Sequence, residues 1–321
     1  AITQNSSTSA LTISGAINPN TTATTITDSA GTISITGGAT GTGNLVFNNN
    51  TATDGAISFT TGSLNNTGSI TNSGLGAGSV TIGVVVGTSV TGVTQNSTTS
   101  ALILSGTNTY TGTTTVNAGT LSIGAASNIN SGTGGITLGG GTLLITGAAN
   151  SVTLSGTVTL TAGTSSTLAV PSGKALTLSG NIGSSTGALI MGGGSYTGTV
   201  VLSGTNAYTG GTTVNTGTLS ISAASNINSG VGGITLGNAT LRLTGTSSSA
   251  TLTGDVTLTA GVTATLKAAS GNVLTVNGNI ASSTGALTIG GGDTGTVVLG
   301  GTNAYSGGTL ISTGTLKLGS A

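Results

Sequence analysis

Small apolar residues alternate with Thr, Ser or another polar residue through almost the whole chain. Residues 157–161 read TVTLT and residues 175–178 read ALTL, and Gly, Asn or Ser bounds most such stretches. Alternation with period two between turn residues is typical of strands that bury one face. In residues 101–200 it predicts strands at 115–116, 120–123, 135–138, 142–145, 151–154, 157–161, 167–170, 175–178, 188–190 and 199–202. No window keeps helical spacing for long, and the abundant Thr, Val and Gly disfavour helices, so the pattern predicts an all-β protein.

One long phrase occurs three times. Residues 104–124 read LSGTNTYTGTTTVNAGTLSIG, and the phrase returns at 202–222 and 299–319, at offsets of 98 and then 97 residues. Self-similarity at a fixed period is typical of a solenoid, in which each coil packs only on its neighbours. We therefore expect one continuous β-solenoid over residues 1–321, with coils of roughly 20 residues. It comprises a diverged block at 1–100, full units at 101–200 and 201–298, and the start of a further unit at 299–321.

Comparison of the two full units predicts which side chains point inward. Aliphatic residues stay aliphatic at six paired positions, whereas their alternating neighbours change freely. The six pairs are Ile136 and Ile234, Leu138 and Leu236, Leu143 and Leu241, Ile145 and Leu243, Leu160 and Leu258, and Leu168 and Leu266. The changing neighbours are Leu144, which becomes Arg242, Thr157, which becomes Asp255, and Ala169, which becomes Lys267. We expect the first set to form the core and the second set to face outward.

Charge is scarce, and this excludes several classes of function. The chain has 4 Lys+Arg, 4 Asp+Glu and no His or Cys. Four scattered cations cannot neutralise a nucleic-acid backbone, so we expect no nucleic-acid partner. Thiolate and imidazole metal sites lack ligands, and disulfides cannot form. No run of about 20 apolar residues is present, so the sequence predicts no transmembrane segment.

The repeated phrase resembles the passenger-associated repeat of bacterial autotransporters. The shared pattern is L-x-G-x-N-x-Y-x-G-x-T followed by G-x-L-x-[IL], which here begins at Leu104 and ends at Ile123. The resemblance implies a right-handed parallel β-helix, export to the cell surface or the medium, and a role in adhesion or surface architecture. It implies no enzyme activity.

The repeated polar and aromatic positions are the candidate site residues. Asn108, Asn206 and Asn303 could serve a function, but we interpret them as turn residues whose amides bond neighbouring backbone. The tyrosines that follow them, Tyr110, Tyr208 and Tyr305, could form a ligand-stacking stripe. We interpret them instead as side chains that pack over a turn and cap the core.

No catalytic, cofactor-binding or metal-binding residue is predicted. Residues 290–295, GGGDTG, resemble part of a calcium-binding nonapeptide, but a calcium site needs six or more oxygens and this segment has a single carboxylate, Asp293. Asp255 and Lys267 lie near each other in sequence and could act as an acid–base pair, yet each replaces a neutral residue of the preceding unit.

These observations favour a non-catalytic extracellular structural protein that associates with itself in a surface filament, matrix or layer. A neutral surface promotes association, and open strand edges invite stacking. The alternative is an adhesin passenger that binds a host receptor or glycan. A third hypothesis is an ice-binding surface made of Thr rows, such as Thr157, Thr159 and Thr161 or Thr257 and Thr259, although the spacing of Thr from coil to coil is irregular in sequence.

Overall fold

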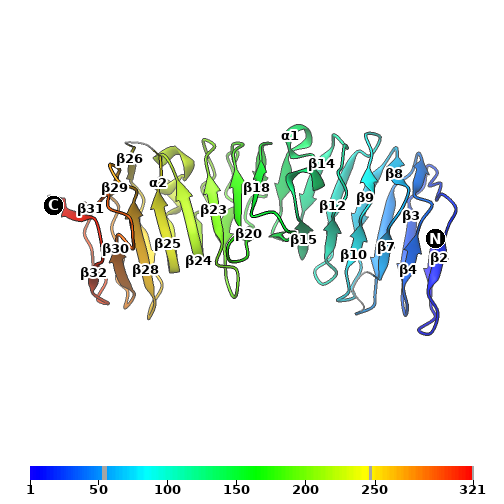
Figure 1. The fold of residues 1–321 in the computed structure, drawn as a ribbon, viewed down its shortest axis with the longest axis horizontal. Coiled ribbons are helices and arrows are strands. Elements are labelled where there is room, and N and C mark those ends of the chain that lie inside the picture. The colour runs from blue at the N-terminus through cyan, green and yellow to red at the C-terminus, as the bar shows by residue number, and fades with distance from the viewer. Residues whose placement is uncertain (53–55, 246–247, 320–321) are drawn as a thin grey trace. The chain divides into compact units, whose positions relative to one another are not determined.

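The computed structural model describes residues 1–52, 56–245 and 248–319. The chain divides into two compact units, residues 1–159 and residues 160–321, which are taken separately below. Each unit is a stack of coils whose strands pair in parallel with the strands of the next coil (Figure 1). This confirms the parallel β-solenoid. The predicted repeat boundaries at 100, 200 and 298 stay predictions.

Unit 1 is built on three parallel sheets that run along its coils. The first contains β1 (Ile2–Gln4), β3 (Thr24–Asp28), β6 (Leu45–Asn49), β9 (Ser69–Asn72), β12 (Gly92–Gln95), β14 (Thr113–Val116) and β16 (Ile136–Leu138). The second contains β2 (Leu11–Ile13), β4 (Ile33–Ile35), β7 (Ile57–Phe59), β10 (Val80–Ile82), β13 (Leu102–Leu104), β15 (Thr120–Ile123) and β17 (Thr142–Ile145). The third, shorter sheet contains β5 (Ala39–Gly41), β8 (Ser63–Asn66) and β11 (Val85–Val86). Strands β18 (Ser151–Leu154) and β19 (Val158–Leu160) follow.

Unit 2 has the same architecture, with two strands long enough to cross a corner between faces. These are β24 (Thr212–Ile221) and β25 (Ile234–Leu243), which pair with each other over most of their length. Their first halves stack with β20 (Ser165–Ala169), β22 (Ala188–Met191) and β27 (Val256–Leu258). Their second halves stack with β21 (Ala175–Leu178), β23 (Thr199–Leu202), β28 (Thr263–Ala268), β30 (Ala286–Ile289) and β32 (Thr309–Ile311). The third sheet is β26 (Ser249–Leu252), β29 (Val273–Val276), β31 (Thr296–Leu299) and β33 (Thr315–Leu318).

All ten strands predicted in residues 101–200 are present, with ends shifted by at most two residues. The prediction missed four short helical segments. These are η1 (Ala126–Asn128), α1 (Ser131–Gly134), η2 (Ala224–Asn226) and α2 (Ser229–Gly232). A helix of three or four residues has no apolar periodicity, because one turn already takes 3.6 residues.

The interior is aliphatic, as the unit-to-unit comparison predicted. All twelve paired positions are buried, with at most 2% of each side chain exposed. Arg242 and Lys267 are half-buried and Asp255 is exposed, so the outward prediction is right for the charged residues. It is wrong for Ala169, which is only 1% exposed. A methyl side chain barely extends beyond the backbone, so it can be covered from either face of a strand.

Successive copies of the repeated phrase do not stack on the same face. Starting from Leu219, the in-register neighbours in the following coils are Leu241, Leu266, Ile289 and Ile311. Those four coils span 92 residues, whereas the phrase returns only after 97. Ile311 therefore corresponds in the repeat to Val214, not to Leu219. Within unit 2 the third copy is rotated by one face relative to the second.

The core of unit 1 also contains polar side chains. Gln4, Asp28 and Asn49 follow one another in register, and Gln95 lies in register with Asn72. All five are less than 9% exposed, and Asp28 is completely buried. Most of their polar atoms bond to the backbone of turns, for example Asn49 Nδ2 to the carbonyl of Gly78 at 2.7 Å. The Oδ2 atom of Asp28 has no hydrogen-bond partner among the described residues.

Candidate functional site: the repeated Asn–Tyr phrase

The asparagine of the phrase occupies the place of a peptide group in the third sheet. Asn108 follows β11 by one coil, and its Oδ1 accepts a hydrogen bond from the N–H of Val86 at 2.8 Å. Its Nδ2 donates to the carbonyl of Asn128, one coil further on. The side-chain amide thus links the preceding coil to the following one, as a backbone amide does in a parallel ladder. Asn108 is 6% exposed, so both bonds are shielded from water.

The second copy reproduces this geometry in unit 2. Asn206 accepts from the N–H of Ile182 at 2.7 Å and donates to the carbonyl of Asn226. The residue is 7% exposed. Buried amides that bond on both sides are rigid, because loss of either bond would leave a buried backbone group unpaired.

A second asparagine, which the sequence analysis did not single out, reinforces the link. Asn128 Oδ1 accepts from the N–H groups of Gly124 and Ala125, each at 2.8 Å, and its Nδ2 donates to the carbonyl of Gly106 at 3.0 Å. Asn226 does the same with Ser222, Ala223 and Gly204. The signal was available, because the phrase AASNINSG occurs at both 125–132 and 223–230.

The tyrosines of the first two copies are fully buried beneath the strand that follows them. The hydroxyl of Tyr110 lies 2.6 Å from Thr114 Oγ1, and that of Tyr208 lies 2.6 Å from Thr212 Oγ1. Both rings have 0% exposure. Burial raises the pKa of Tyr110 and of Tyr208 to about 12, and the bond to threonine opposes this only in part. These two rings are therefore not available to stack on a ligand.

The third copy lies at the last described coil, and its side chains differ in environment. Asn303 still accepts from the N–H of Ile280, at 3.2 Å, but its Nδ2 donates to Gly301 in its own coil at 2.9 Å. Tyr305 keeps its bond to Thr309 but is only half-buried. The phrase therefore forms its full set of contacts only where coils lie on both sides of it.

A glycine in each copy is required by its backbone conformation. Gly119, Gly217 and Gly314 have φ angles of +55°, +80° and +72°. A Cβ on Gly217 would lie 2.4 Å from the carbonyl oxygen of Gly198 in the preceding coil. A residue other than glycine is therefore disfavoured at position 217 for two reasons: the positive φ angle and the clash of its Cβ with the preceding coil.

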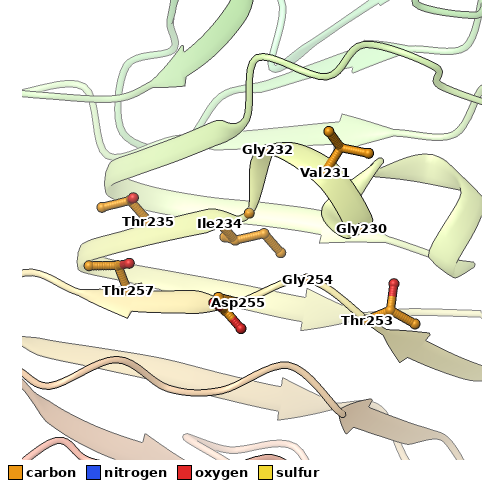
Figure 2. Close-up of a pocket in the computed structure, with 10 residues that line it drawn as sticks. Gly230, Val231, Gly232, Ile234, Thr235, Thr253, Gly254, Asp255 and Thr257 are labelled. Atoms are coloured by element: carbon orange, nitrogen blue, oxygen red, sulfur yellow. The ribbon is translucent and has the colours of Figure 1, made fainter.

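A cavity of about 360 Å³ opens beside α2 in unit 2. It is lined by residues 230–235, 253–255 and 257. Figure 2 shows Thr235 and Thr257 side by side on neighbouring strands, where they pair in register. Asp255 is the acidic residue of this lining, and its Oδ1 accepts from the N–H of Asn279 in the next coil at 2.9 Å. Lys267 donates instead to the carbonyl of Gly291, so Asp255 and Lys267, which the sequence suggested as an acid–base pair, bond to different groups.

The loop considered for calcium is held by an ion pair. Asp293 accepts from Arg242 Nε at 2.7 Å and from Nη2 at 3.1 Å, a bidentate arrangement. Over residues 1–52, 56–245 and 248–319, three or more His, Cys, Asp or Glu residues do not gather anywhere in a way that could hold a metal ion.

A family model described as the passenger-associated-transport-repeat matches the chain three times, at residues 99–123, 195–221 and 292–318. The matches cover about a quarter of the chain and include all six candidate residues. Together with the parallel β-solenoid they confirm the resemblance, and the chain is similar to autotransporter passenger proteins. No curated protein and no solved structure matches the chain significantly. In the described part of the chain, no helix has both the length and the apolar character needed to cross a membrane.

Proposed function

We propose that this chain is a non-catalytic extracellular structural protein whose coils associate with further copies in a surface filament, matrix or layer. The observation that carries the proposal is the fate of the repeated side chains. Asn108, Asn206, Tyr110 and Tyr208 are all buried and bonded between or within coils. A motif whose side chains are used to join coils stabilises the solenoid and does not present groups for binding or catalysis at its surface.

The neutral outer faces support self-association. Thr71, Thr94, Thr115 and Thr137 lie in register along the first sheet of unit 1 and are half-buried. They form a straight row with rungs about 4.8 Å apart. The flanking outward positions are Ser, Gly, Thr and Asn, so no like charges oppose the approach of a second copy along this row.

The test is electron microscopy and sedimentation of the purified chain over a concentration series. Ordered filaments or sheets are expected, and a Thr94→Lys, Thr115→Lys variant should assemble less because it places two cations on the neutral row. Circular dichroism would verify that the variant keeps its β structure, which both outward positions allow. A chain that stays monomeric at every concentration refutes self-association.

A passenger adhesin is the second candidate, and one observation favours it. Three of the chain's few charged side chains, Arg242, Lys267 and Asp293, gather on one outer face of unit 2. Binding of a receptor or glycan by the purified chain, without assembly, would favour this function over the structural one.

A further inference from the structure

A second threonine row runs along an outer face of unit 2. Thr199, Thr218, Thr240, Thr265 and Thr288 lie in register on β23, β24, β25, β28 and β30. All five are half-buried, and each is followed along its strand by a buried aliphatic residue. Coil lengths of 19 to 25 residues conceal the row in the sequence, which is why the spacing of Thr looks irregular there. The result is a line of hydroxyl groups with one rung per coil.

Two cations stand next to this row. Two positions further along the same strands, Arg242 and Lys267 pair in register. The guanidinium of Arg242 is bonded to Asp293, but 39% of the Arg242 side chain is exposed against 14% of Asp293. The cation therefore faces outward while the carboxylate is mostly covered. Among the described residues, Lys267 has no carboxylate within ion-pair distance and donates only a long bond, 3.4 Å, to the carbonyl of Gly291.

The cluster is specific to this copy of the repeat. In the preceding unit the same positions hold Leu144, Ala169 and, in the loop, Ser195 and Tyr196. Three separate changes thus meet at one place on an otherwise almost neutral chain. A bidentate ion pair alone would need only two of them, so the structural role of the Arg242–Asp293 pair leaves Lys267 unexplained.

A glycine loop borders the row on one side. Gly290, Gly291 and Gly292 all have left-handed φ angles, of +94°, +53° and +99°. A Cβ on Gly291 would lie 3.2 Å from Cγ2 of Thr265, so the loop passes directly beside the row. The hydroxyls, the two cations and this loop form one continuous strip of surface.

We propose that this strip binds an anionic polysaccharide, with sugar hydroxyls on the threonine row and an anionic group of the sugar on Lys267 and the outer edge of Arg242. The linear row suits an extended polymer, because both advance in small equal steps along one axis. Charge complementarity supplies the orientation, since Lys267, which has no carboxylate within ion-pair distance among the described residues, lies directly beside the row. This binding site goes beyond the structural role and does not depend on self-association.

The experiment is titration calorimetry of the full chain with four polymers: polygalacturonate, heparin, neutral dextran and polyglutamate. We expect binding to polygalacturonate or heparin that weakens as salt is raised, with none to dextran and much weaker binding to polyglutamate. Polygalacturonate carries carboxylates alone and heparin carries sulfates as well, so binding to heparin without binding to polygalacturonate would indicate a sulfate ligand.

Two variants with a matched control locate the site. Lys267→Ala restores the residue of the preceding unit and should weaken binding about ten-fold, as expected for loss of a charge-assisted hydrogen bond. Thr240→Val keeps the shape of the row but removes one hydroxyl, and should weaken binding by a few-fold. Lys317→Ala removes a cation from β33, in the other sheet, and should leave the affinity unchanged.

Three results would overturn the proposal. These are the absence of binding to both acidic polysaccharides, equal affinity of Lys267→Ala and the native chain, and equal affinity for polyglutamate. The assembly assay is independent of all three, so failure of this inference and failure of the structural role can be told apart.

Discussion

The asparagine of the repeated phrase offers a direct test of how coils are held together. Asn206→Ala would remove two buried hydrogen bonds, from the N–H of Ile182 and to the carbonyl of Asn226. Both partner residues are at most 4% exposed, so water cannot replace the lost amide without a change in packing. Each unpaired buried group costs about 1–3 kcal/mol, so we expect a loss of roughly 2–6 kcal/mol in the free energy of unfolding.

The chain carries its own control at Asn303. This residue is exposed, and one of its two bonds stays within its own coil. Ile280 is buried like Ile182, but Asn303 itself is exposed, so water can take the place of its amide at the N–H of Ile280. Asn303→Ala should therefore cost less than about 1 kcal/mol. Asn206→Asp tests the donor separately, because it keeps the size and the acceptor but sets a carboxylate oxygen against the carbonyl of Asn226.

Urea denaturation followed by far-ultraviolet circular dichroism measures these differences. Hydrogen exchange at the amide of Ile182 adds a local measurement, which matters because solenoids can open locally. The amide should exchange much faster in Asn206→Ala than in the native chain and should be unchanged in Asn303→Ala. Equal stability losses at the two asparagines would refute the view that the phrase acts by bridging coils.

Three further predictions concern single positions. Tyr110 and Tyr208 have pKa values raised from 10.0 to about 12, so each contributes about 2–3 kcal/mol to the free energy of unfolding, complete below pH 10 and lost as the pH rises to 12. Absorbance titration of tyrosinate should show the raised pKa values, and alkaline denaturation should show the loss of stability. Ionisation of all four tyrosines near pH 10 without unfolding would contradict this prediction. Asp28→Asn should leave the free energy of unfolding, measured by urea denaturation, unchanged or raise it by about 1 kcal/mol, because it removes a buried carboxylate whose Oδ2 has no described partner. A clear loss of stability would mean that the carboxylate is needed. Gly217→Ala should lower the free energy of unfolding by about 2 kcal/mol or more, because the φ of this residue is +80° and the new Cβ would meet the carbonyl of Gly198. Thermal denaturation measures the effect, and a midpoint equal to that of the native chain would show that the turn adapts.

Much of the fold could be predicted because it depends on local pattern. Alternation at residues 175–178 forces a strand with one buried face, whatever lies next to it, and β21 occupies those residues. The same alternation, read with the changes between the two units, placed Arg242 and Asp255 on the outward side, where Arg242 is half-buried and Asp255 is exposed. The repeated phrase likewise indicated the passenger-type solenoid, since a repeat of this length can bury its apolar residues only by stacking.

The residues of the candidate site could be predicted from the sequence, but the contacts that they make could not. Asn108 and Tyr110 were visible as repeated residues, yet nothing in the sequence shows that the Asn108 amide reaches one coil back and one coil forward. Asn128 escaped notice although it also bridges coils. Hydrogen bonds over some 20 residues depend on how many residues each coil contains, which local pattern does not specify.

The sequence by itself determined the strands, their buried faces and the solenoid that stacks them, because these follow from side-chain alternation and repetition. Only the tertiary structure decided the register between coils. That register aligns Thr199 with Thr218 and Thr240, brings Arg242 beside Lys267, and rotates the third copy of the phrase by one face. The physical reason is that turns of different length make the coils unequal, so residues with irregular spacing in the chain become neighbours through backbone hydrogen bonds alone.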